Sequence, residues 1–165
     1  MKKVEPISVS LVLEAMLNEL NTYNSPRAEV IILEANIEFI LNELLRLHFD
    51  TDVLRRIPID KKLDVLSDVG YISEKFKKDI RKIIDIRDLY AHSPDLYDKA
   101  IQTKIISELD KLSLIKELPE NLLTELKKKD AHSQIVDMCI KILSKVMKEY
   151  NAILETKLKK DDYQR

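Results

Sequence analysis

The chain has 165 residues, of which 45% are hydrophobic and 35% charged, with a formal net charge of −1 at pH 7. This length fits a single domain, and the balanced charge restricts any RNA site to a local patch. A single glycine leaves little room for the turns of a sheet and excludes a Gly-rich phosphate loop. The lone Cys139 excludes an internal disulfide framework and suits a reducing cytoplasm.

Two long apolar patterns predict the first two helices. The first begins near Pro6 and ends within residues 21–24, and its polar residues make it too hydrophilic for a signal or membrane segment. Ser25 and Pro26 then start a second helix, as cap and first residue, that runs to about Phe49. Because apolar residues wrap most of its circumference, this helix is central in the fold or also forms a subunit interface.

A connection over residues 50–58 leads to a short helix from Lys61 to Val69, with Asp60 as its predicted cap and Gly70 as its stop. Asp60, Asp64 and Asp68 share one face of that helix at four-residue steps. Such a row collects a divalent cation or is simply a solvated face, and the second interpretation is the commoner one.

The next helix carries a conflict between pattern and residue. Ser73 is its predicted cap, and the helix runs to about Ala91 before Ser93-Pro94 ends it. Its apolar positions step by four and three, and Arg87 occupies a place on that seam. Burial of an unpaired charge costs several kcal/mol, so Arg87 needs a carboxylate, a cleft or a ligand. The apolar seam of this helix consists of Phe76, Ile80, Ile83 and Tyr90. The candidate carboxylates lie on the second helix and are Glu34, Glu38 and Glu43.

Three further helices complete the predicted all-α bundle. Asp98 caps a helix that carries Ile101, Ile105, Leu109 and Leu112, residues 114–118 are ambiguous, and Pro119 opens a short helix. The last helix runs from about His132 to Leu158. We therefore expect one domain over residues 1–160, built on long antiparallel core helices, and a charged tail over residues 161–165.

The sequence around the conflict resembles a known family. Arg87, four intervening residues and His92, with the polar Asp88 directly after the arginine, resemble the R-x(4-6)-H signature of the HEPN superfamily of helical domains. The longer stretch from Lys62 through Ser93, with a short helix that stops at glycine before the motif helix, resembles the mannitol operon repressor branch of HEPN-like proteins. Placement at the end of an amphipathic helix makes the match more specific than the short motif alone.

The resemblance implies two functions. The first is RNA binding with metal-independent endoribonuclease activity of the toxin or defence type, in a homodimer that leaves 2′,3′-cyclic phosphate ends. In that case His92 is the general base, Arg87 stabilises the developing charge, Asp88 orients the pair, and Tyr90 and Ser93 contact substrate. The second is a non-catalytic regulator, similar to the mannitol operon repressor branch, that acts through protein contacts. The expected protein partner is accordingly an antitoxin or another regulatory protein.

Helix geometry weighs against catalysis within one chain. Five residues advance a helix by about 140° beyond one turn, so Arg87 and His92 do not point the same way. The catalytic interpretation requires a frayed last turn or two motif helices paired across a two-fold axis. The structural alternative is an ordinary capped helix end with the surface pairs Arg81–Asp85 and Asp88–His92, and with Tyr90 in the core and Ser93 near the helix end.

No cofactor, metal or membrane contact is expected. The three histidines, His48, His92 and His132, lie on separate elements without ligand spacing, and Cys139 falls in an apolar stripe. The basic clusters at Arg55-Arg56, at residues 77–82 and at residues 127–129 either line an RNA path or are solvated surface.

Overall fold

The computed structural model describes residues 9–22, 25–49 and 53–163. Within these ranges the chain is helical and contains no strand, which confirms the predicted all-α bundle. The elements, in chain order, are α1 (Val9–Thr22), α2 (Pro26–Phe49), the 3-10 helix η1 (Val53–Arg56), α3 (Ile59–Asp68), α4 (Glu74–His92), α5 (Lys99–Leu109), α6 (Ser113–Lys116), α7 (Glu120–Lys127) and α8 (Ala131–Tyr163).

Helix α2 is the centre of the bundle, as its apolar circumference predicts. It contacts α1, η1, α3, α4 and α8, and α8 covers most of its length. Its seam residues Leu33, Ile37, Ile40 and Leu44 are fully enclosed, each at most 1% exposed. Because each fully buried aliphatic side chain stabilises the fold by about 1.5–3 kcal/mol, this seam is a major contribution to stability.

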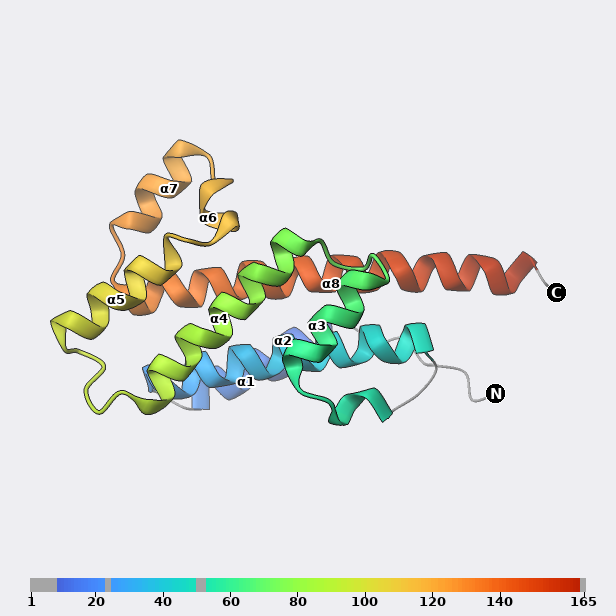
Figure 1. Cartoon of the computed structure of the whole chain (residues 1–165), viewed down its shortest axis with the longest axis horizontal. Helices are drawn as coiled ribbons and strands as arrows, with labels where there is room; N and C mark the ends of the chain where they lie inside the picture. The colour runs from blue at the N-terminus through green and yellow to red at the C-terminus, as the bar shows by residue number, and fades with distance from the viewer. Residues whose placement is uncertain (1–8, 23–24, 50–52, 164–165) are drawn as a thin grey trace.

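The long helices do not all alternate in direction. Helix α4 runs antiparallel to α2, since Ser93 at its end contacts Arg27 near the start of α2. Helix α8 instead lies parallel to α2, with His132 near its own start beside Glu29 near the start of α2. The intervening helices α5 to α7 return the chain to the end of the bundle from which α2 begins (Figure 1).

The predicted helix boundaries were right except in a few places. Ser73 accepts a hydrogen bond from the Phe76 amide at 3.2 Å, which confirms it as the cap of α4, and Asp98 likewise caps α5. Asp60 is not the cap of α3, because that helix begins at Ile59 directly after Pro58, and Asp60 lies in its first turn. The predicted start near Pro6 lies outside the described residues.

Two further boundaries differ from prediction. The ambiguous segment before Pro119 contains the short helix α6, so α5 ends at Leu109 and Leu112 is buried just before α6. Helix α8 continues to Tyr163, beyond the predicted end at Leu158. The single domain over residues 1–160 and the tail over 161–165 stay predictions.

Helices α6 and α7 project from one side of the bundle (Figure 1). Asp79, a buried carboxylate in α4, holds the start of α6. It accepts hydrogen bonds from the Ser113 amide at 2.7 Å, from the Leu114 amide at 3.1 Å and from the Ser113 hydroxyl. The carboxylate thus satisfies the free amides at the start of α6 and ties this short helix to α4.

The core of α8 provides a stability test. Ile142 is fully buried, whereas Ile140, two residues earlier on the same helix, is 39% exposed. We expect Ile142→Ala to lower the free energy of unfolding by about 2–5 kcal/mol, because it removes core contacts and leaves a cavity. Urea denaturation followed by circular dichroism measures the change. Ile140→Ala is the matched control and should change the free energy by less than about 1 kcal/mol; equal losses in the two variants would contradict the placement of α8.

Candidate functional site

The end of α4 carries the predicted motif on a regular helix. Residues through His92 are helical, and the Ser93 amide donates a hydrogen bond to the Leu89 carbonyl at 3.0 Å. Ser93 itself is extended, as a residue before proline should be. Because the last turn is closed, Arg87 and His92 keep their helical separation of about 140°.

Arg87 pairs with two carboxylates. Its Nη2 atom lies 3.5 Å from Glu34 Oε1 on α2, and its Nη1 atom lies 2.9 Å from Asp88 Oδ1. The Arg87 side chain is 30% exposed, and that of Glu34 is 8% exposed. The Nη atoms of Arg87 are therefore paired, in part with one of the α2 carboxylates that the sequence suggested, whereas its buried Nε atom has no hydrogen-bond partner in the described part of the chain.

Glu34 occupies an unfavourable environment for a charge. Burial raises the pKa of Glu34 above its usual value, although the nearby Arg87 guanidinium acts in the opposite direction. Glu38 and Asp88 add a smaller repulsion that also raises this pKa. The Arg87–Glu34 pair is thus a partly buried contact between α4 and α2 in which desolvation outweighs attraction.

His92 lies on the exposed side of the helix end. Among the described residues no side chain forms a hydrogen bond, ion pair or ring contact with it. Asp88, its predicted neighbour, binds Arg87 instead. The motif residues are consequently split: Arg87 and Asp88 form a pair toward α2, and His92 stands apart in solvent.

The predicted Arg81–Asp85 pair is wrong. Arg81 reaches across to α3, where it binds Asp60 at 3.0 Å and Asp64 at 2.7 Å, and Asp85 binds Lys82 at 3.3 Å. Helix-to-helix contact displaces the local pair because two carboxylates on α3 face one guanidinium. The same contacts engage Asp60 and Asp64, two of the three carboxylates in the acidic row on α3. The pKa of Asp64 lies below its usual value because its hydrogen bonds to Arg81 and Lys77 outweigh desolvation.

The two residues predicted to touch substrate lie mostly inside. Tyr90 is fully buried and Ser93 is 7% exposed. The Tyr90 ring lies 5.9 Å from that of His132, and burial raises the pKa of Tyr90 strongly. The Ser93 carbonyl accepts a hydrogen bond from Arg27 Nη2 at 2.6 Å. Tyr90 therefore closes the core seam of α4, and Ser93 joins the helix end to α2.

Contacts between distant elements were missed by the sequence interpretation. They are Arg27 with the Ser93 carbonyl, Glu29 with His132 at 2.7 Å, and Asp79 with α6. Each joins residues more than 30 positions apart, so no local spacing reveals it. The one available signal was Asp79 itself, a carboxylate directly before the seam residue Ile80.

Neither a cluster of metal ligands nor a reactive thiol is present in the described part of the chain. There, no group of three or more His, Cys, Asp or Glu side chains is placed to hold a metal ion. Cys139 is buried in the core as predicted, and burial raises the pKa of its thiol to about 12.

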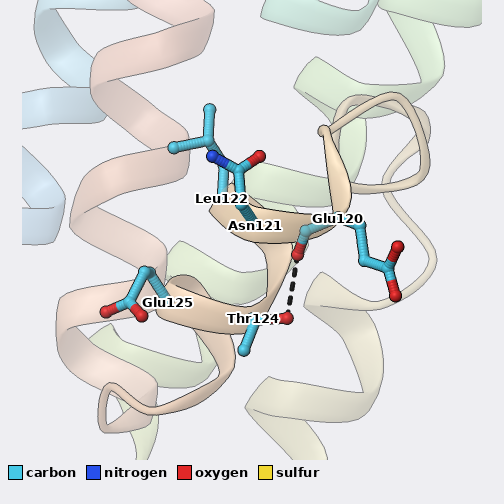
Figure 2. Close-up of a pocket in the computed structure, with 5 residues that line it drawn as sticks. All are labelled: Glu120, Asn121, Leu122, Thr124 and Glu125. Atoms are coloured by element: carbon cyan, nitrogen blue, oxygen red, sulfur yellow. Dashed lines mark hydrogen bonds between the residues drawn. The ribbon is translucent and has the colours of Figure 1, made fainter.

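Two shallow surface hollows lie away from Arg87 and His92. One is on α7 and is lined by Glu120, Asn121, Leu122, Thr124 and Glu125. Figure 2 shows these side chains spread around a single short helix, with Thr124 bonded back to the Glu120 carbonyl. The other hollow lies on α5. Neither is lined by a residue of the predicted motif.

Comparison with known proteins identifies a shared fold. No family model matches the sequence, and no curated protein matches it either. A chain in the X-ray structure of the MtlR–HPr complex from Escherichia coli superposes with a TM-score of 0.58, over 82% of this chain and 98% of that chain. The chain has the helical fold of MtlR, the mannitol operon repressor. At 14% identity this likeness concerns the fold alone.

Membrane insertion was not expected from the sequence. Within the described residues, no helix combines the length and apolar character needed to cross a bilayer.

Glu34 gives a test of the α2–α4 contact. The pKa of Glu34 in the folded state lies above the value of 4.5 for the free side chain, so the folded state holds the proton more tightly than the unfolded state does. Ionisation of Glu34 therefore costs stability as the pH rises. Stability contributed by the protonated form is present at low pH and is lost as pH rises. Glu34→Gln cannot ionise. We therefore expect its free energy of unfolding, relative to wild type, to increase from about pH 4 to about pH 7 in urea titrations. A constant difference across this range would show that Glu34 is not held in a desolvated position.

Proposed function

We propose that this protein is a non-catalytic regulatory module that works by binding another folded protein. The observation that carries the proposal is the state of the motif. Arg87 is engaged by Glu34 and Asp88, whereas His92 is exposed and points elsewhere on a regular helix. A ribonuclease needs a base and a cation that converge on one phosphate, and this arrangement separates them.

The shared fold supports the same proposal. MtlR was solved in complex with HPr, so its fold serves as a platform for another protein in that structure. We extend this to the present chain and propose a protein partner of the HPr type. Under this proposal the Arg87–Glu34 pair has an architectural role, since it aligns α4 on α2.

The second candidate is a HEPN-like ribonuclease. Its support is the intact Arg87–His92 motif and the solvent exposure of His92. It requires a homodimer in which two α4 helices meet, because the closed last turn of one chain keeps the two residues apart. In that assembly His92 is the base, Arg87 and Asp88 form the charged pair, and RNA is the substrate.

An RNA assay discriminates the two candidates. Mixed-sequence RNA is incubated in EDTA with the wild type, Arg87→Ala and His92→Ala, each checked for folding by circular dichroism. We expect no cyclic-phosphate ends from any of the three, because no single chain aligns both groups. Cleavage by the wild type that both variants lose would establish the ribonuclease and overturn the regulatory proposal.

Partner binding gives the positive test. We expect saturable binding of purified Escherichia coli HPr to the full chain in isothermal titration calorimetry. Heat-unfolded HPr is the control, because we expect this chain to recognise the surface of folded HPr, by analogy with the MtlR–HPr complex. Absence of binding by folded HPr would remove this partner from the proposal.

A further inference from the structure

The loop between α4 and α5 presents one aromatic side chain to solvent. Tyr97 is 78% exposed, the largest exposed fraction among the exposed large hydrophobic side chains of the described residues. The others lie on helices; Tyr97 lies on a connecting loop that follows the motif helix. A single exposed aromatic residue is ordinary, so its surroundings decide whether it has a use.

The loop around Tyr97 is held on both sides. The Tyr97 amide donates to Asp95 Oδ1 at 2.8 Å, and Asp98 Oδ1 accepts from the Ala100 and Ile101 amides at 2.8 and 3.2 Å. The preceding Leu96 packs on the core, and its carbonyl accepts a hydrogen bond from the Gln102 side chain. The backbone on either side of Tyr97 is therefore preorganised, which lowers the entropic cost of binding through this side chain.

The loop carries two carboxylates that form no ion pair with the described residues. Asp95 and Asp98 are exposed, and in the described part of the chain neither forms an ion pair. Each uses its Oδ1 atom for the backbone, so its Oδ2 atom remains available for a cation. Two free carboxylates that flank an aromatic ring fit a protein surface with a basic residue beside an apolar one.

A shallow hollow adjoins the loop on α5. It is lined by Asp98, Lys99, Ala100, Thr103, Lys104 and Ser107. Its charges are mixed, so the net negative character belongs to the loop and the hollow adds a recess next to it. The phosphates of RNA are disfavoured at this loop because they would approach two carboxylates.

We propose that the Tyr97 loop, defined as Pro94, Asp95, Tyr97 and Asp98, is the docking surface for the folded partner of this protein. This inference rests on the proposed function. The partner is a protein whose contact surface places a basic side chain against Asp95 and Asp98 and an apolar group against the Tyr97 ring. The dominant contact is Tyr97, because aromatic residues on rigid supports carry much of the binding energy of small interfaces.

The test is calorimetric titration of Escherichia coli HPr into full-length variants. Tyr97→Ala should weaken binding by about tenfold or more. The double variant Asp95→Asn with Asp98→Asn keeps the turn and the helix cap, since asparagine fills both roles, but removes the charge. It should weaken binding by about three- to tenfold and flatten its salt dependence. Leu122→Ala on α7, 48% exposed, is the control and should bind as wild type does.

The outcomes separate the inference from the proposed function. Binding of HPr that survives both loop changes overturns the docking surface and leaves the proposed function standing. If HPr does not bind the wild type, both the HPr-type partner of the proposed function and the docking surface for it are overturned. Binding of single-stranded RNA in place of HPr, lost in Tyr97→Ala, would assign the loop to base stacking and also overturn the inference.

Discussion

The structure depends on covering α2. Apolar side chains occupy several sides of this helix, so no single neighbour can bury them, and α1, α3, α4 and α8 each cover a part. Helices α5 to α7 leave the end of the bundle where α2 begins and come back to it, so that α8 then runs along α2 in the same direction.

Carboxylates on α2 specify which neighbour lies where. Glu34 pairs with Arg87 of α4, and Glu38 pairs with Lys62 of α3 at 2.5 Å. Lys62 is only 1% exposed, so loss of its partner would leave a buried charge without compensation. Apolar packing alone permits helices to slide or exchange places, whereas a buried cation is satisfied at one register. We therefore expect the Arg87–Glu34 and Lys62–Glu38 pairs to determine the positions of α4 and α3 on α2 more than they raise the free energy of unfolding.

Local features were predictable and distant ones were not. Apolar periodicity, Ser73, Asp98 and Pro26 placed most helices correctly, because a helix start is determined by adjacent residues. The conflict at Arg87 indicated a carboxylate on α2 but left Glu34, Glu38 and Glu43 as candidates, of which Glu34 is the partner. The attachment of α6 by Asp79, the parallel course of α8 and the Glu29–His132 contact depend on which helices become neighbours. Periodicity gives the buried face of a helix but does not identify the helix that covers it.

Asp60 was misplaced because α3 begins directly after Pro58, before the aspartate.

The regular end of α4 has opposite consequences for catalysis and for binding. Catalysis needs Arg87 and His92 on one phosphate, and the closed last turn, held by the Ser93–Leu89 hydrogen bond, keeps them apart. Binding needs only a rigid, exposed surface, and the same closed turn supports one: the chain leaves α4 at Ser93, where Arg27 fixes the carbonyl, and enters a loop tied down at Asp95 and Asp98. The closed turn that keeps Arg87 and His92 apart in one chain is therefore also the feature that would hold the proposed docking loop in place.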